Sequence, residues 1–302
     1  MAGTQTNINL KVLKSTILSW LKTRLSSDTY QKLDKTFQNF VNGAEDWEVF
    51  SSFSGVPRYI GKDPLNLTEK ELERAHSIRP DWKPGQWRTD QLARTLLLLG
   101  IAERDKEEFL DKLEKIFISS DMGEAEALYQ SLPVLPYPLE LQKRAAEGIR
   151  SNITSVFEAV ALRNPYPADY MDEDAWNQIV LKALFVDSPF YLIHGIDRRA
   201  NQKLAKMLVE YAHERWSAGR EVSPELWRPV GPFVHEGYLA DLEKVLNNPN
   251  DIQKSAAVLA LSATETDNVK KLLSQYSGIA ESVSKKNISW KDIGKKWQFK
   301  QK

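Results

Sequence analysis

Side chains suited to ligand binding are concentrated in the segment RNPYPADYMDEDAW, residues 163–176. Arginine, tyrosine and tryptophan combine a large contact surface with a hydrogen-bonding group, and they are enriched at binding sites. We expect Pro165 and Pro167 to favour extended backbone at the residues before them, and Asp172 to cap a following helix. The prolines and acids therefore have a structural explanation, whereas the arginine and the aromatic residues are left as contact groups. We predict that this segment forms an ordered rim beside a ligand or partner site.

The predicted site also takes in polar residues of the helices expected on either side of this segment. Its candidate ligand- or partner-binding residues are Glu158, Arg163, Asn164, Tyr166, Tyr170, Trp176, Asn177 and Lys182. Several of them have a structural alternative. The tyrosine rings can seal a junction between helices with their hydroxyls bonded to backbone, and Asn177 can hydrogen-bond a neighbouring backbone group. Glu158 and Lys182 are also candidates for an acid or base if the protein is an enzyme.

Motifs of known catalytic chemistry are absent. The stretch GVPRYIGKD, residues 55–63, resembles a phosphate-binding loop, but it has five residues between its glycines and an Asp where Ser or Thr would bind magnesium. The four histidines show no zinc-binding spacing, no G-x-S-x-G elbow occurs, and there is no cysteine. We therefore expect no catalytic residue, no cofactor and no bound metal, although distant histidines could still meet in the fold.

Composition and charge narrow the class of protein. Forty-one basic residues balance forty-one acidic ones, so the formal net charge is zero. A dedicated nucleic-acid binder needs a clustered excess of Lys and Arg, so we expect no nucleic-acid partner. The N-terminal MAGTQTNINLKVLK lacks the layout of a signal peptide, and the apolar run TLLLLGIA, residues 95–102, is too short to cross a bilayer. These features predict a cytoplasmic protein.

Helical periodicity runs through almost the whole chain. Apolar residues recur every three or four positions in the segments 10–25, 28–41, 138–162, 173–187, 200–218, 236–247, 250–262 and 267–277. Amphipathic helices joined by short connections pack as antiparallel neighbours. The prediction is an all-α fold whose antiparallel helix pairs stack in an irregular HEAT-like or α-solenoid arrangement. Because no flexible linker divides the chain, we expect one helical domain over residues 1–280.

The remaining segment, residues 281–302, has a basic amphipathic composition. Its stretch SVSKKNISWKDIGKKWQFKQK contains seven Lys and one Asp, interleaved with Trp290, Ile293 and Trp297. Such helices lie on anionic membrane surfaces or bind partners. One hypothesis is that these three apolar side chains insert at the membrane interface, which would make the protein peripheral to the inner membrane. The alternative is a flexible, solvated terminus.

Two long phrases of the sequence carry a family resemblance. One runs from AAEGIRSNITSVFEAVALRNPYPADYMDEDAWNQIVLKALF to LVEYAHERWSAGREVSPELWRPVGPF, and the other is RPDWKPGQWRTDQLARTLLLL. Both resemble the EboA family of bacterial proteins, over roughly residues 50–235. That family belongs to an operon with a prenyltransferase-like membrane protein and hydrolase-like or isomerase-like enzymes. The resemblance implies a role in moving secondary-metabolite precursors across the cytoplasmic membrane, and it implies no catalytic residues.

Three functions stay open at this point. The first is a non-enzymatic binding protein for traffic or export of a secondary-metabolite precursor, with a small-molecule metabolite or prenylated intermediate as ligand and proteins of the same operon as partners. The second is an α-helical protein–protein scaffold, because stacked helices form concave binding faces. The third is an enzyme with an unrecognised acid/base site. A deep pocket would favour the first, a broad groove the second, and a cluster of His, Glu and Lys the third.

Overall fold

The computed structural model describes residues 8–301, and these residues form eighteen α-helices and six short 3-10 helices. No β-strand occurs in that range; a single isolated bridge joins Pro64 to Arg88. The all-α prediction is confirmed. The chain divides into two compact units, Met1–Met171 and Asp172–Lys302. The expectation of one domain over residues 1–280 stays a prediction.

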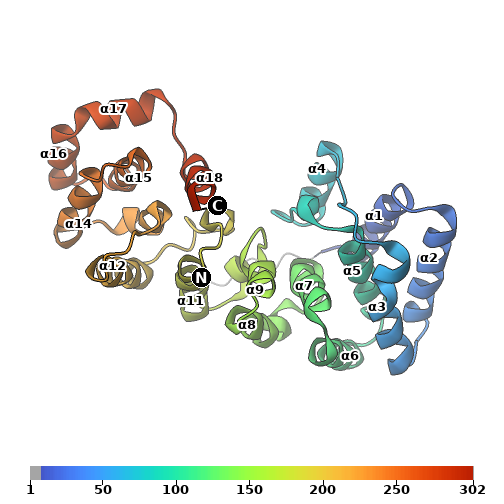
Figure 1. Cartoon of the computed structure of the whole chain (residues 1–302). Helices are drawn as coiled ribbons and strands as arrows, with labels where there is room; N and C mark the ends of the chain where they lie inside the picture. Colours follow the sequence, from blue (N-terminus) through green and yellow to red (C-terminus); the bar gives the residue numbers. More distant parts are fainter. Residues whose placement is uncertain (1–7, 302) are drawn as a thin grey trace. The chain divides into compact units, whose positions relative to one another are not determined.

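The first unit is built around one helix that is buried on every side. Its helices are α1 (Leu10–Lys22), α2 (Ser27–Val41), α3 (Asp46–Ile60), α4 (Glu69–Ile78), η1 (Pro84–Gln86), α5 (Thr89–Ile101), α6 (Lys106–Ser119), α7 (Met122–Ser131), η2 (Leu132–Val134), η3 (Pro138–Leu141), α8 (Gln142–Arg150), α9 (Thr154–Ala161) and α10 (Tyr166–Tyr170). All thirteen residues of α5 are buried, and α1, α2, α3 and α7 pack around it (Figure 1). The apolar run 95–102 therefore belongs to a protein core.

Local sequence signals explain most of the helix starts in this unit. Thr68 and Glu71, in the sequence pattern TEKE, form a capping box: the Thr68 hydroxyl accepts the Glu71 N–H at 3.3 Å, and the Glu71 carboxylate accepts the Thr68 N–H at 2.8 Å. Thr89 is not the cap of α5, although Thr is favoured at the cap position of helices. The helix begins at Thr89 itself because the Gln91 side chain accepts the N–H of Arg88 at 2.8 Å.

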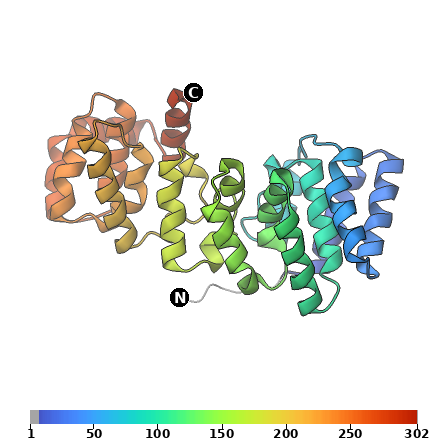
Figure 2. The same ribbon diagram turned by 60° about the horizontal axis from the view of Figure 1, so that its bottom comes forward.

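The segment 138–162 is not the single helix that its periodicity predicts. It divides into η3, α8 and α9, with a turn at residues 151–153 in which the Ser151 hydroxyl accepts the N–H of Ile153 at 3.1 Å. The hydroxyl competes with the helical hydrogen bond, as Ser side chains do at turns. The turn leaves Ile153 47% exposed while Ile149 stays buried. In Figure 2 the helices of this unit, coloured from blue to green, stand side by side.

The second unit contains the remaining helices. They are α11 (Glu173–Phe185), η4 (Phe190–Leu192), α12 (Gln202–Ser217), η5 (Pro224–Leu226), α13 (Trp227–Val230), η6 (Gly231–Phe233), α14 (Glu236–Leu246), α15 (Asp251–Leu261), α16 (Asp267–Gln275), α17 (Ser277–Lys285) and α18 (Trp290–Gln301). Helix α15 is its centre and contacts α13, α14, α17 and α18. Gly231 lies so close to this helix that an added Cβ would be 2.8 Å from the Ala260 carbonyl oxygen.

The C-terminal segment is helical and packs within the second unit. Helix α18 contacts α15, η4 and η5, and it buries Ile293 and Trp297, which are 1% and 3% exposed. The Gln298 side chain donates to the Asp187 carbonyl oxygen at 3.2 Å. Two of the three side chains expected to enter a membrane are thus occupied by the protein's own core. None of the helices in residues 8–301 combines the length and apolarity needed to span a bilayer.

Candidate functional site

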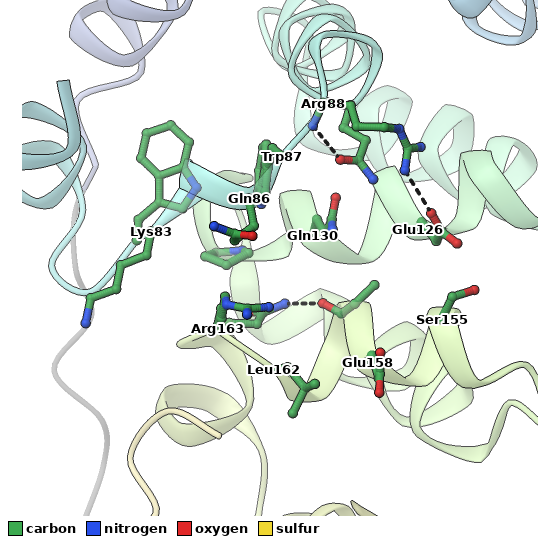
Figure 3. Close-up of a pocket in the computed structure, with 15 residues that line it drawn as sticks. Lys83, Gln86, Trp87, Arg88, Glu126, Gln130, Ser155, Glu158, Leu162 and Arg163 are labelled. Atoms are coloured by element: carbon green, nitrogen blue, oxygen red, sulfur yellow. Dashed lines mark hydrogen bonds and ion pairs between the residues drawn. The ribbon is translucent and has the colours of Figure 1, made fainter. Parts of the chain in front are cut away.

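A cavity of about 220 Å³ opens in the first unit between three short stretches of chain (Figure 3). The segment 82–91, which leads through η1 into α5, forms one wall. Helix α7 contributes Glu126 and Gln130, and α9 with the loop after it contributes residues between 155 and 164. The first part of the segment 82–91, residues 82–88, has no regular helix beyond η1, because Pro84 and Gly85 interrupt it. Two tryptophans of this wall, Trp82 and Trp87, line the cavity.

One end of the cavity is charged and fixed by an ion-pair network. Arg88 lies 3.0 Å from the Asp90 carboxylate and 3.6 Å from that of Glu126. Asp90 is fully buried and also pairs with the buried Arg94 at 3.0 Å. Burial lowers the pKa of Arg88, but its hydrogen bond to Asp90 and the charges of Asp90 and Glu126 outweigh this, so the pKa lies above its ordinary value. Arg88 therefore stays a cation at the cavity wall.

Two polar atoms among the lining residues are buried without a hydrogen-bond partner in the described part of the chain. They are the Gln130 side-chain oxygen, an acceptor, and the Trp82 ring nitrogen, a donor. Buried polar groups are nearly always paired, so an unpaired acceptor and an unpaired donor on two residues that line one cavity favour an outside partner there. Figure 3 shows Gln130 on α7 between Trp87 and the loop that carries Arg163.

Three of the sequence-predicted site residues line this cavity: Glu158, Arg163 and Asn164. The Asn164 side chain is fully used by the fold, because it donates to the carbonyls of Tyr129 and Ala159 at 3.0 and 2.9 Å and accepts the Tyr166 N–H at 3.0 Å. Asn164 therefore positions the loop.

Arg163 directly precedes Asn164 in the chain. Its backbone has a φ of 53°, in the left-handed region that non-glycine residues rarely adopt. Its side chain is exposed at the cavity mouth, beside α9 (Figure 3). Such a conformation costs on the order of 1 kcal/mol and persists only where neighbouring contacts impose it, as the bonds of Asn164 do here. The loop thus holds a cation at the mouth.

The two tyrosines lie outside the cavity lining, on the far side of the same segment. Tyr166 is fully buried, and its hydroxyl donates to the Pro138 carbonyl oxygen at 2.5 Å. Its ring packs 5.1 Å from the Tyr170 ring, and burial raises the pKa of the Tyr166 hydroxyl. This geometry matches the structural alternative for the tyrosines, in which the rings seal a helix junction.

The acidic residues of the same segment make different contacts. Asp172 caps α11 as expected, accepting the N–H of Ala175 at 2.7 Å. Asp174 pairs with Lys203 at 2.5 Å on the surface. Asp169 pairs with the buried Arg79 at 2.6 Å. A buried guanidinium requires a carboxylate partner, and this need decides the position of Asp169.

The remaining predicted residues belong to the second unit. Trp176 is 1% exposed and the guanidinium of Arg199 lies 5.2 Å from its ring centre. Asn177 is buried and hydrogen-bonds the side chain of Asn201. Lys182 is half-buried, and burial lowers its pKa. The eight candidate residues are therefore divided between the two units, and only the first three line the cavity of the first unit.

The other wall of the cavity was not predicted from the sequence. Trp82, Trp87, Arg88, Glu126 and Gln130 were not among the candidates. The signal was present in RPDWKPGQWRT, which places two tryptophans in a loop rich in proline and glycine. Loops held by a rigid scaffold carry a disproportionate share of binding residues, and this criterion would have selected the segment. Within residues 8–301, no group of three or more His, Asp or Glu side chains is arranged to hold a metal ion.

Comparison with known proteins adds one family match. Residues 13–231, more than half of the chain, match a family model described as "Metabolite traffic protein EboA". No curated protein and no solved structure shows a significant match.

Proposed function

Because the chain belongs to the EboA family of metabolite traffic proteins, we propose that the cavity of the first unit binds a small metabolite during that traffic. The observation that carries this proposal is the pair of unpartnered buried atoms among the lining residues, the Gln130 oxygen and the Trp82 ring nitrogen. A ligand with one hydrogen-bond donor and one acceptor would satisfy both.

The chemistry of the lining defines the ligand further. Two indole rings offer flat apolar surface, while Arg88, Glu126 and Arg163 supply charge at the edges. Ligand sites commonly combine such an apolar lining with a few polar groups that fix orientation. The volume of about 220 Å³ suits a small metabolite or the head of a larger molecule, such as a prenylated intermediate whose chain extends outside.

The proposed role is binding without catalysis, in traffic or export of a secondary-metabolite precursor. The family membership supports this role. The ion pairs of Arg88 with Asp90 and Glu126 support it too, because they hold the arginine in a fixed position at the cavity wall. The membrane and enzyme partners of its operon would deliver and receive the ligand in the cytoplasm. We also propose that the helix pairs stack in a HEAT-like manner within each unit, which agrees with the contacts of α7 with α9 and of α14 with α15.

Mass spectrometry of small molecules that co-purify with the protein from its native host tests this proposal. We expect one compound to be enriched with the native chain and depleted at least tenfold with Gln130→Leu, which leaves the ligand's donor unpaired. The matched control is Gln202→Leu, at an exposed position of α12. Equal recovery of the compound with Gln130→Leu, or no compound with the native chain, would contradict the proposal.

A further inference from the structure

Helix α18 has a buried side and an exposed side of different chemistry. Ile293, Gly294 and Trp297 face the second unit and are buried. At 100° per residue, Lys295 and Phe299 lie almost opposite Ile293 and Trp297, and both are exposed. Phe299 is 85% exposed, the largest value among the exposed large apolar side chains of the described residues. A large apolar side chain is costly in water, so this residue is not explained by a helix face that contacts only solvent.

Lysines border this phenylalanine. Lys291, Lys295 and Lys296 are exposed, and none of them forms an ion pair within 4.0 Å in the described part of the chain. Asp292 is the single acid of the helix. It accepts the Ser289 hydroxyl at 2.6 Å and the Ser289 N–H at 3.0 Å, and these hydrogen bonds, together with the charges of Lys296 and Lys295, lower its pKa. The face therefore has a clear excess of positive charge in a protein whose net charge is zero.

A second exposed phenylalanine belongs to the same region of the unit. Gln298, next to Phe299, hydrogen-bonds the carbonyl of Asp187, and Phe185 precedes that residue by two positions at the end of α11. Phe185 is 76% exposed. The two exposed phenylalanines thus lie one and two positions away from the residues of one hydrogen bond, which joins α18 to the turn after α11.

We propose that this face of α18 docks the protein on a bilayer surface carrying anionic lipid, with Phe299 and Phe185 entering the interface and Lys291, Lys295 and Lys296 contacting headgroups. The unpaired lysines complement the charge of anionic lipid, and the apolar side chains beside them gain free energy when they leave water. The two buried residues Ile293 and Trp297 hold the helix in the unit and do not insert.

A lipid surface fits the face better than a nucleic acid does. All basic residues of α18 are lysines, which act as point charges on a diffuse anionic surface, whereas specific phosphate recognition favours the bidentate fork of arginine. Exposed phenylalanine side chains are costly in water, and they gain free energy when they enter the acyl boundary of a membrane.

Sedimentation of the full chain with vesicles measures the association. We expect the protein to sediment at low salt with vesicles made of equal parts phosphatidylcholine and phosphatidylglycerol, and to stay in solution with pure phosphatidylcholine. The triple variant Lys291→Gln, Lys295→Gln, Lys296→Gln should bind on the order of 100-fold more weakly, since each lysine near an anionic surface contributes about fivefold. Phe299→Ser should bind roughly tenfold more weakly.

A charge-matched variant separates this face from general electrostatic attraction. Lys143→Gln, Lys270→Gln, Lys271→Gln removes the same charge from exposed lysines of α8 and α16 and should keep at least half of the binding. All variants change exposed residues, so their melting temperatures should equal that of the native chain. The proposal is wrong if the native chain stays in solution with the anionic vesicles or if both triple variants lose equal affinity. It is also wrong if DNA, and not vesicles, distinguishes the two triple variants.

Discussion

The side-chain amides of Asn177 and Asn201 hydrogen-bond each other in both directions, at 2.8 Å and 3.3 Å. Asn201 is the N-cap of α12, where its oxygen also accepts the Leu204 N–H at 2.8 Å, and Asn177 projects from the buried side of α11. The pair therefore joins the capping of one helix to the packing of another.

Replacing Asn177 by Leu should destabilise the second unit by about 1–3 kcal/mol, because the Asn201 amide loses its buried partner. Urea unfolding followed by circular dichroism measures the loss. The matched control is Asn268→Leu, at an exposed position of α16. It should change the free energy of unfolding by less than about 0.5 kcal/mol. Equal stabilities of the native chain and Asn177→Leu would show that the amide pair contributes nothing.

The two tyrosines of the predicted rim should respond differently to loss of the hydroxyl. Tyr166→Phe removes the bond to the Pro138 carbonyl and should lower the free energy of unfolding by about 1–3 kcal/mol. Tyr170→Phe keeps the ring contact between the two side chains and is the matched control, with an expected change below about 0.5 kcal/mol. Chemical denaturation distinguishes the two variants. A larger loss with Tyr170→Phe would refute the assigned sealing role of the Tyr166 hydroxyl.

Glu225 should make the stability of the second unit depend on pH. This residue is fully buried, and neither carboxyl oxygen makes a hydrogen bond of normal geometry in the described residues. Burial raises the pKa from 4.5 to about 8, although the charge of Arg228 and the nearby Tyr191 N–H oppose the shift. The folded state therefore binds the proton more tightly than the unfolded state, and stability falls as the pH rises from 4.5 to about 8.

The slope of this fall is at most about 1.4 kcal/mol per pH unit. Glu225→Gln stays neutral and should remove most of it, so the variant should be more stable than the native chain above neutral pH. Denaturation midpoints measured across this range provide the check, with Glu265→Gln at an exposed position as control. A native chain whose stability does not fall over this range would rule out the protonated carboxyl.

Two glycines should respond to alanine in opposite directions. At Gly231 a new Cβ would be 2.8 Å from the Ala260 carbonyl oxygen, a backbone atom that cannot move aside, so Gly231→Ala should cost about 1–3 kcal/mol. Gly278 in α17 has open space around it, and Gly278→Ala should stabilise by up to about 1 kcal/mol through helix propensity. Thermal melting gives the sign for each variant. Stabilisation by Gly231→Ala would mean that η6 and α15 lie farther apart.

Much of the fold follows from the sequence alone. Helical periodicity, the Thr68 capping box and the Asp172 cap are local properties, because a helix depends on contacts three or four residues apart. These signals predicted the all-α class and the start of α11 correctly. The phrases in residues 145–233 and 79–99 also carried the family resemblance that the match over residues 13–231 confirms.

Only the tertiary structure determines which of the candidate residues lie close together. Tyr166 and Arg163 are three positions apart, yet one is buried against Pro138 and the other is exposed at the cavity mouth, because the bonds of Asn164 turn the loop between them. Trp82 and Gln130 both line that cavity although 48 residues separate them along the chain. Such a meeting depends on long-range packing around α5, which no local pattern encodes. The same holds for α18: its periodicity shows an apolar side, but only the contact with α15 shows that this side is already covered and that Phe299 is not.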